Sequence, residues 1–259
     1  MPAYNAEKTL AKTYEQLPHG IVDRVIIGDD CSHDDTVAIA KNLRAELFVH
    51  EKNLGYGGNQ KTCYREALKC KEDIIIMVHP DYQYSPRLVT AMAAMIASGE
   101  YDVVLASRIL GKGAVRGGMP LYKYYSNRVL TLIENLLLNN KISEYHTGYR
   151  AYHRRVLEQL PLEENSDDFV FDNQMLAQII VWKYRIGEIS CPTRYFPEAS
   201  SINFRRSCKY GLGVLWTAFQ GFLALNGLRT ARFLSKEGRT LSSSKHTLVK
   251  TQEVDYASS

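Results

Sequence analysis

Short aliphatic runs alternate with longer mixed stretches along the first 110 residues. The aliphatic runs predict strands at 24–30, 45–50, 73–78 and 101–107. The stretches between them predict helices at 7–16, 34–43, 57–69 and 86–98. Short apolar strands separated by helices are typical of a mostly parallel sheet that helices cover on both faces. The pattern therefore predicts an α/β fold, with ligands bound beyond the carboxyl ends of the strands.

The second half predicts fewer and longer elements. One long helix is expected after the Gly/Pro break at 117–120, and another over 170–184, where apolar residues recur at helical spacing. Residues 210–228 come close to membrane-spanning length, but Gln220 and several Gly interrupt them, so we expect an amphipathic or packed helix. We predict one domain over 1–228 and a disordered Ser/Thr/Lys-rich tail over 229–259, with a helical segment closing the domain.

Composition narrows the function classes. The 259 residues carry a net charge of +4, which permits phosphates or a lipid surface as partners but does not favour nucleic acid. Five cysteines without a Cys-x-x-Cys pair favour reduced thiols, and the first residues do not form a secretory signal. We therefore expect a cytoplasmic protein.

Two polar segments follow predicted strands. Asp29 and Asp30 in "GDDCSHDDT" place carboxylates where a base N–H or a ribose hydroxyl could donate to them; solvated acids beside a helix N-cap are the alternative. Gly57 lies in "NLGYGGNQKT", a Gly-rich turn opening a helix. Its free N–H groups suit a phosphate, although the turn alone favours a plain strand-to-helix connection over a phosphate site.

The segment "HPDYQ" carries the sharpest chemistry. In extended backbone His79, Asp81 and Gln83 point the same way, because side chains alternate. An imidazole, a carboxylate and an amide oxygen can hold a divalent ion, Mn²⁺ or Mg²⁺, with positions left for diphosphate oxygens. The alternative is that His79 and Asp81 cap the helix that begins near Pro86.

Taken in order, these segments resemble the inverting family 2 glycosyltransferases of GT-A fold, especially the dolichyl/polyprenyl-phosphate sugar synthases. The segments that carry the resemblance are Pro2–Glu7, Gly28–Thr36, Asn53–Gln60, His79–Pro86, Ala106–Gly113, Gly117–Arg128, Tyr145–Leu157 and Gly187–Phe204. The resemblance implies a metal-dependent transfer of a hexosyl group from a nucleotide-sugar, UDP- or GDP-linked, to a polyprenyl phosphate or a glycan.

The resemblance also implies roles for individual residues. The nucleotide pocket would be lined by Pro2, Ala3, Tyr4 and Glu7, with Asp29 on the base and Asp30 supporting the loop. The metal motif falls on His79-Pro80-Asp81, and Gln83 matches a further ligand. The acceptor phosphate would be held by Arg108, Lys123, Ser126 and Arg128.

Three positions depart from the family pattern. His79 stands where the family has an Asp, and Cys31 where it has a Gly. The family has a full first strand at the centre of its sheet, so the strand at Pro2 is expected to be truncated.

The acceptor decides whether a general base is needed. A phosphate is already anionic, whereas a sugar hydroxyl requires a base, for which Glu144, Asp172 and His146 are candidates. Each has an alternative: Glu144 and His146 as hydrogen-bonded turn residues, Asp172 as a charge at a helix N-terminus.

Two further alternatives stay open. Arg205, Arg206 and Lys209 precede an apolar helix, which predicts peripheral contact with the inner face of a membrane, or simply a packed helix with a solvated basic end. The chain can also be a non-catalytic nucleotide-sugar-binding module. A nucleotidyltransferase is disfavoured because no Gly-rich start is followed by a basic residue.

Overall fold

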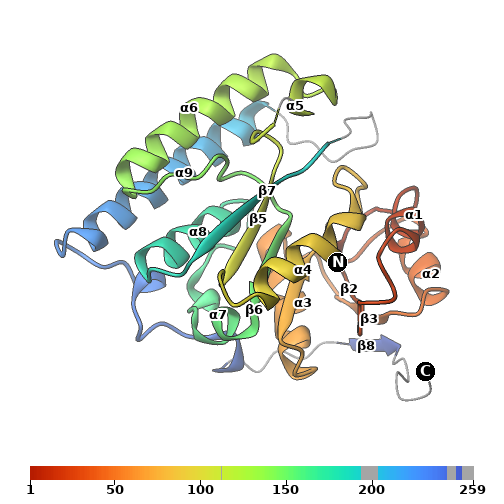
Figure 1. Ribbon diagram of the computed structural model, residues 1–259. Helices are drawn as coiled ribbons and strands as arrows, with labels where there is room; N and C mark the ends of the chain where they lie inside the picture. The colour runs from red at the N-terminus through yellow and green to blue at the C-terminus, as the bar shows by residue number, and fades with distance from the viewer. Residues whose placement is uncertain (112, 194–203, 244–248, 253–259) are drawn as a thin grey trace.

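Two four-stranded sheets form the centre of the structure, a computed structural model that describes residues 1–111, 113–193, 204–243 and 249–252 (Figure 1). The strands are β1 (Pro2–Ala3), β2 (Ile26–Asp29), β3 (Glu46–Val49), β4 (Ile74–Met77), β5 (Val103–Ser107), β6 (Arg150–His153), β7 (Ile186–Ser190) and β8 (Val249–Gln252). The α-helices are α1 (Leu10–Glu15), α2 (Thr36–Lys41), α3 (Tyr56–Lys69), α4 (Val89–Ala97), α5 (Gly113–Arg116), α6 (Leu121–Leu137), α7 (Arg154–Gln159), α8 (Phe171–Val181) and α9 (Phe204–Leu225). Short 3₁₀ turns are η1 (Pro86–Leu88), η2 (Leu162–Glu164), η3 (Arg232–Leu234) and η4 (Leu241–Ser243). The predicted α/β class is confirmed.

The strand directions are mixed, whereas the sequence predicted a mostly parallel sheet. The first sheet has the order β1-β2-β3-β8, and its first three strands are parallel. The second has the order β4-β6-β5-β7, in which β6 runs antiparallel to both of its neighbours. The difference arises because β6 comes from the irregular second half of the chain and is inserted between β4 and β5.

The first strand is short and stands at an edge. Pro2 pairs with Gly28 and Ala3 with Asp29, so β1 contributes two residues to the first sheet. Among the described strands, β4 forms one edge of the second sheet, and β1 does not pair with it. The Met1 ammonium group donates to the Ile26 carbonyl at 2.7 Å, which extends this edge by one further contact.

Strand β5 shows why the central runs are apolar throughout. Val103 and Leu105 face the core beneath α8, whereas Val104 and Ala106 face the core beneath α1 and α4. Successive side chains of a strand point to opposite faces, and both faces are covered here. All four side chains are fully buried, so a polar residue at any of these four positions would lose contact with water.

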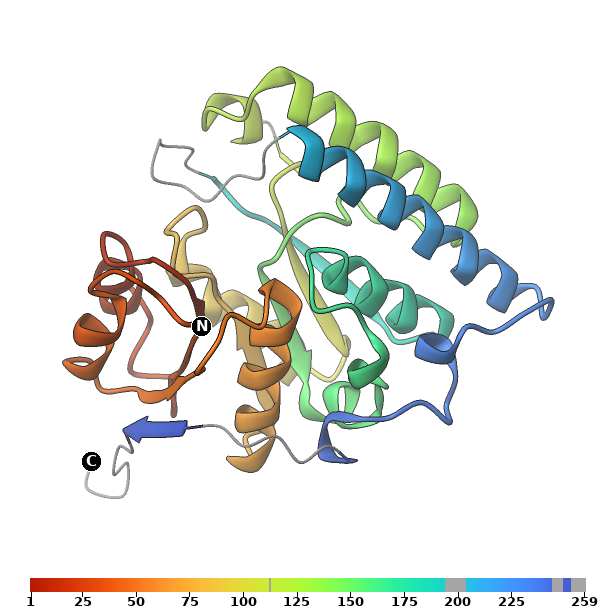
Figure 2. The ribbon, with the colours of Figure 1, turned by 180° about the vertical axis from the view of Figure 1, so that it is seen from behind.

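The predicted disordered tail is wrong for the described part of 229–259. Phe233, Leu234 and Leu241 are buried in the core beside α8. The indole of Trp182 donates to the Leu234 carbonyl at 3.0 Å. Strand β8 pairs antiparallel with β3, at the far side of the molecule from α9 (Figure 2). A few apolar residues anchor this segment although its composition is polar.

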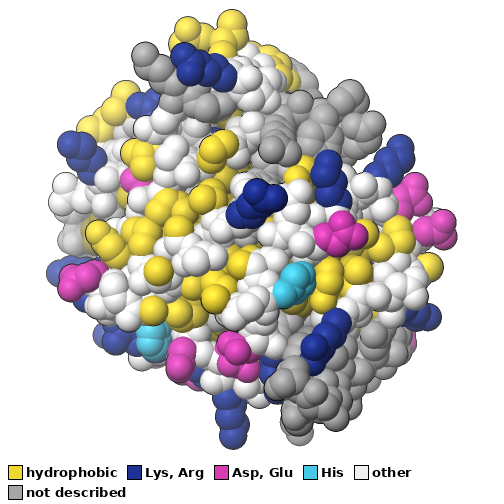
Figure 3. Space-filling model, turned by 45° about the vertical axis from the view of Figure 1, so that its right-hand side comes forward, with side chains coloured by type: hydrophobic (Ala, Val, Ile, Leu, Met, Phe, Trp, Pro, Cys, Tyr) yellow, Lys and Arg dark blue, Asp and Glu magenta, His cyan; other side chains and the backbone are white. Residues whose placement is uncertain are grey.

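Helices α6 and α9 lie side by side and both pack toward α8 (Figures 1 and 2). Helix α9 buries Val214 and Ala218 and exposes Leu212 and Trp216, in agreement with the amphipathic or packed helix predicted for 210–228. None of the described helices is long and apolar enough to cross a membrane. On the face shown in Figure 3, charged side chains of both signs lie among the hydrophobic ones.

Replacing Phe233 by Ala tests the anchoring of this segment. Because the side chain is only 6% exposed, we expect Phe233→Ala to lower the free energy of unfolding by about 3 kcal/mol. Ile21→Ala is the control, since Ile21 is 50% exposed and its loss should change stability little. Urea unfolding measures both. Equal midpoints for the two variants would contradict a packed segment.

Candidate functional site

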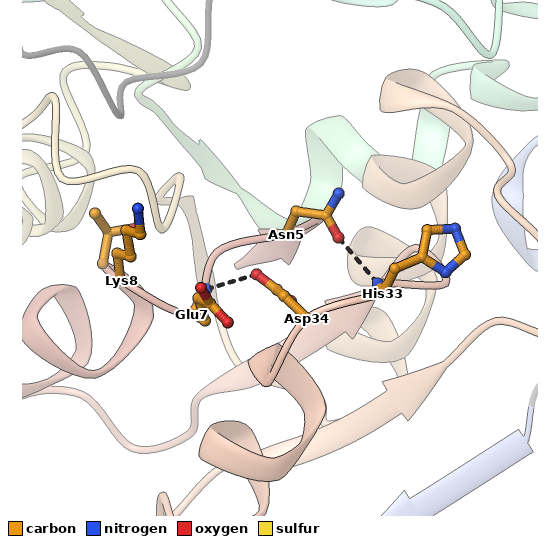
Figure 4. A pocket seen from close by; sticks show the side chains of 6 residues that line it. Asn5, Glu7, Lys8, His33 and Asp34 are labelled. Atoms are coloured by element: carbon orange, nitrogen blue, oxygen red, sulfur yellow. Dashed lines mark hydrogen bonds between the residues drawn. The ribbon is translucent and has the colours of Figure 1, made fainter.

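Loops that follow the carboxyl ends of β1, β2, β4 and β5 carry several of the predicted site residues. A surface cleft of about 400 Å³ opens between the first two loops (Figure 4). It is lined by Asn5, Glu7, Lys8, Thr9, His33 and Asp34. The cleft thus includes Glu7 from the predicted nucleotide pocket, while the neighbouring Tyr4 is 50% exposed.

Hydrogen bonds across the cleft hold its two walls together. The Glu7 N–H donates to Asp34 Oδ2 at 3.1 Å, and the His33 N–H donates to Asn5 Oδ1 at 3.0 Å. Burial alone would raise the pKa of Asp34, but hydrogen bonds from Thr36 and from the Glu7 N–H outweigh it and lower the pKa below its usual value. Asp34 is therefore a fixed negative charge in the cleft wall.

Asp29 and Asp30 both turn inward. Asp29 accepts hydrogen bonds from the Ser32 hydroxyl at 2.6 Å and from the Ser32 N–H at 3.0 Å. Asp30 accepts from the backbone N–H groups of Leu54 and Gly55, at 2.7 and 3.0 Å, which is the loop-supporting role expected for it. Cys31, the residue after Asp30, has φ 62°, a left-handed conformation that explains why a Gly is expected there.

The first turn of α3 is occupied by the protein's own backbone. The Gly57 and Gly58 N–H groups donate to the Asp167 carbonyl at 2.8 and 3.3 Å. A Cβ on Gly57 would lie 2.4 Å from the Ser166 carbonyl oxygen. The prediction that Gly57 contacts a phosphate is wrong here. Its N–H group donates to Asp167, and the absence of a side chain allows close packing against Ser166 and Asp167.

The segment after β4 does not continue as a strand. The chain turns at Pro80–Asp81, and Tyr82 has φ 57°. The Gln83 N–H donates to Asp81 Oδ1 at 3.1 Å, which closes the turn. The prediction that His79, Asp81 and Gln83 share one face of an extended segment is therefore wrong, because the backbone leaves the extended conformation between them.

A chain of hydrogen bonds joins His79 to Asp172. The Tyr56 hydroxyl donates to Asp172 Oδ2 at 2.6 Å and lies 3.1 Å from His79 Nε2. Because the hydroxyl has one proton and gives it to Asp172, it accepts from His79 Nε2–H. The neutral imidazole then keeps the lone pair on Nδ1. Burial lowers the pKa of His79, although Asp81 and Asp172 act in the opposite direction, so the neutral form is favoured.

His79 and Asp81 are close enough to act electrostatically on each other, and both remain candidate donors to a divalent ion. In 1–111, 113–193, 204–243 and 249–252, no three His, Cys, Asp or Glu side chains gather as a complete metal site. His79 Nδ1 and the second oxygen of Asp81 supply a nitrogen and an oxygen donor. Mg²⁺ and similar ions in phosphate-binding enzymes are commonly held by one or two protein groups plus substrate oxygens.

Glu144 is paired with Arg108 and is fully buried. The Arg108 guanidinium donates through Nε at 2.7 Å and through a second nitrogen, and the Arg108 N–H donates to the other carboxylate oxygen at 2.7 Å. Burial alone would raise the pKa of Glu144, but the charge and hydrogen bonds of Arg108 lower it below its usual value. The contacts do not support Glu144 as a general base, because its oxygens already accept these bonds.

Helix α6 brings the other predicted acceptor residues toward this pair. The Asn127 amide donates to Glu144 at 2.9 Å, and Arg128 donates to the Ser143 carbonyl at 3.2 Å. Lys123 lies one turn before Asn127 and is half-buried, whereas Ser126 is exposed. Lys123 thus lies on the same side of α6 as Asn127, and Arg128 directly follows Asn127 in the helix.

His146 belongs to a closed polar ring with Glu134, Asn173 and Tyr210. Tyr210 donates to Asn173 Oδ1 at 2.6 Å, and His146 Nδ1 lies 2.9 Å from the Tyr210 hydroxyl. The Asn173 amide donates to Glu134 Oε1 at 2.8 Å. His146 Nε2 and Glu134 Oε2 lie 3.3 Å apart, and neither atom has another partner among the described residues.

A single proton between Glu134 Oε2 and His146 Nε2 would close the ring with a hydrogen bond. Tyr210 uses its one proton on Asn173, so His146 Nδ1 carries the ring proton and Nε2 accepts. Burial raises the pKa of Glu134 to about 8 and lowers the pKa of His146 to about 4. A neutral Glu134 can therefore donate to a neutral His146, and the ring leaves His146 without a role as a base.

Sequence reasoning missed the residues that hold the site together. Tyr56, Asn127, Glu134 and Arg150 all make buried or half-buried polar contacts. Tyr56 is 116 residues from its partner Asp172. The only signal in the sequence was Glu134, a lone acid within an apolar helical stretch.

The sequence matches one family model and several named proteins. Residues 1–161 match the sequence model of the family described as Glycosyl transferase family 2. A UDP-N-acetylglucosamine–dolichyl-phosphate N-acetylglucosaminyltransferase of Methanococcus voltae is 27% identical over 212 residues, covering 75% of this chain and 84% of that protein. A polyprenol monophosphomannose synthase of Mycolicibacterium smegmatis is 24% identical over 169 residues, covering 62% of this chain and 63% of that protein.

Solved structures match the fold. A glucosyl-3-phosphoglycerate synthase from Mycobacterium tuberculosis, crystallised with UDP, has a TM-score of 0.64 and 16% identity, covering 89% of this chain and 80% of that one. The same enzyme with Mn²⁺, UDP-glucose and phosphoglyceric acid gives a TM-score of 0.63 at 16% identity, covering 89% and 79%. At this identity the likeness establishes the fold alone.

The polar ring predicts a specific loss of stability with rising pH. A Glu134 pKa of about 8, against an ordinary 4.5, means that the folded protein retains a proton that the unfolded chain has released. Stability therefore falls as the pH rises through this window. His146, with a pKa of about 4 against 6.5, contributes a rise only below pH 6.5. Between pH 6.5 and 8 we expect a loss of about 2 kcal/mol.

Glu134→Gln tests this expectation. The amide reproduces a protonated carboxyl group, so the variant should fold and its stability should not show the Glu134 decline between pH 6.5 and 8. Urea unfolding at several pH values measures both proteins. Parallel curves for wild type and variant would show that Glu134 does not hold the proton.

Proposed function

Because the chain belongs to glycosyl transferase family 2, a family of sugar-transferring enzymes, we propose that it moves a hexosyl group from a UDP- or GDP-sugar, with inversion, to a polyprenyl phosphate. A phosphate oxygen of the acceptor attacks the anomeric carbon. The bond from that carbon to the donor diphosphate breaks, and the nucleoside diphosphate leaves with the electron pair. A glycan is the second acceptor class.

The cleft between the first two loops supports the donor assignment. It is open to solvent, about 400 Å³ in volume, and is lined by Glu7 and the fixed charge of Asp34, with Lys8 as a cation beside them. Carboxylates accept hydrogen bonds from ribose hydroxyls and base N–H groups. The structural relative with UDP-glucose and Mn²⁺ supports a nucleotide-sugar donor and a divalent cofactor.

His79 and Asp81 would hold the divalent ion, Mn²⁺ or Mg²⁺. The ion would offset the negative charge that grows on the departing diphosphate. Tyr56 fixes the His79 tautomer and Asp172 in turn fixes Tyr56, so the Nδ1 lone pair remains available as a donor. The imidazole nitrogen suits Mn²⁺ better than Mg²⁺.

We favour a phosphate acceptor because the three candidate general bases are all engaged in hydrogen bonds within the protein. Glu144 is held by Arg108, His146 by the polar ring, and Asp172 accepts from Tyr56 at 2.6 Å and from Gln60 at 3.1 Å. A sugar hydroxyl would need one of these groups to take its proton. A phosphate acceptor is already anionic and needs none. The two relatives named for dolichyl-phosphate and polyprenol substrates support the same acceptor.

Asp81→Asn tests the proposed reaction. We expect release of nucleoside diphosphate from UDP- or GDP-sugars, with Mn²⁺ and a polyprenyl phosphate, to fall about a hundredfold or more, because the ion loses its charged ligand. Asp23→Asn is the matched control, since Asp23 is an exposed acid on another surface. Calorimetry with Mn²⁺ and donor gives an independent measure of ion uptake.

Two results would contradict the proposal. Unchanged turnover in Asp81→Asn would remove the metal role of this residue. Tight binding of the donor by the wild type without any turnover would instead favour a nucleotide-sugar-binding module.

A further inference from the structure

Helix α6 exposes a row of large apolar residues, whereas its fully buried residues are polar. Tyr122, Tyr125, Val129, Leu132 and Leu136 are 57% to 72% exposed. Their spacing of three and four residues places them on one side of the helix. The buried residues of the same helix are Asn127, Thr131 and Glu134. An ordinary surface helix buries its apolar side. The exposed apolar side of α6 is therefore expected to be an interaction surface.

Helix α9 continues this apolar surface. Leu212, Trp216 and Phe219 are 70%, 59% and 40% exposed, again at spacings of four and three. The two helices lie side by side, and both contact Asn173 of α8, so their outer sides point away from α8 (Figures 1 and 2). We name these eight side chains, five on α6 and three on α9, the α6–α9 face.

Charge around the face is strongly one-sided. Helices α6 and α9 contain five Lys and Arg and a single acid, Glu134, which is buried. The rest of the chain contains 27 Lys and Arg against 27 Asp and Glu. The positive net charge of the protein is thus concentrated in the two helices that build the face. Arg128 and Lys209 are exposed cations within them.

Exposed aromatic residues add a third property. Tyr122, Tyr125 and Trp216 combine a large apolar ring with a polar group, and such side chains are enriched where lipid meets water. Helices with an exposed apolar side and surrounding cations bind anionic lipid surfaces by burying apolar area and by electrostatic attraction. A second copy of the chain is a poorer occupant, because a symmetric dimer would bring two cationic faces together.

We propose that the α6–α9 face docks the protein on the surface of an anionic lipid bilayer, with both helices lying in the plane of the interface. Arg128, which is exposed in the middle of α6, then lies beside the bilayer. The binding follows from the exposed side chains and the charge, and it does not depend on the proposed acceptor. If that acceptor is a lipid phosphate, the same contact delivers it to the site.

Vesicle co-sedimentation of the full chain tests the proposal. We expect binding to phosphatidylcholine vesicles with about 30 mol% phosphatidylserine, much weaker binding to pure phosphatidylcholine, and weakening by salt. The double variant Leu136→Ser/Trp216→Ser should bind at least about tenfold more weakly. The control Tyr4→Ser/Ile21→Ser removes two apolar side chains, each 50% exposed, from other surfaces and should bind like wild type.

A second readout needs no substitution in the face. In Trp182→Phe, Trp216 is the remaining tryptophan of the two in the chain. Its fluorescence should shift to the blue on adding anionic vesicles, and brominated lipids should quench it. Unchanged fluorescence, or equal sedimentation of wild type and the Leu136→Ser/Trp216→Ser variant, would overturn the proposal. If the wild type forms a dimer and does not bind vesicles, and the Leu136→Ser/Trp216→Ser variant is monomeric, the α6–α9 face would instead bind a second copy of the chain.

Turnover separates this inference from the proposed function. With a short, water-soluble polyprenyl phosphate, the double variant should react like wild type although it no longer binds vesicles. Vesicle binding without any turnover would leave the docking surface intact and remove only the proposed reaction.

Discussion

The buried guanidinium of Arg150 holds the two halves of the candidate site together. It donates to the carbonyls of Tyr145, Thr147 and Asp172, at 2.9, 2.7 and 2.7 Å. The first two belong to the loop that carries Glu144 and His146, and the third to the first turn of α8. Because Arg150 is fully buried, each N–H group left without a carbonyl would cost free energy. The arrangement of loop and helix is therefore tightly constrained.

This constraint explains the unusual composition of α6. The loop held by Arg150 presents Glu144 to Asn127, and α8 presents Asn173 to Glu134. The inward side of α6 must therefore be polar where it meets the site. Its apolar residues then fall on the outward side, which is the source of the α6–α9 face. The site and the surface are two consequences of one helix, and a change that makes α6 conventionally amphipathic would disturb both.

Local patterns in the sequence predicted the elements well and the contacts poorly. The four predicted strands exist because continuous apolar runs such as residues 103–106 are needed where both faces of a sheet are buried. The alternation argument failed at His79–Gln83 because a turn at Pro80 changes the direction of each following side chain. Tyr56 and Arg150 gave no signal, since their partners are set by tertiary packing. The tail was misjudged because Phe233 and Leu234 are only two residues within a polar segment.

Charge balance shows how the acceptor end of the site differs from an ordinary phosphate site. Arg108 is in contact with Glu144, so this pair contributes almost no net attraction for an anion. Its contribution is to hold the Arg108 guanidinium in a fixed orientation. The attraction for a phosphate in the proposed reaction would come from Lys123 and Arg128, which carry no contacting carboxylate among the described residues. Both lie on the helix that forms the cationic surface. An anionic lipid at that surface would therefore meet the uncompensated charges first and the oriented Arg108–Glu144 pair afterwards.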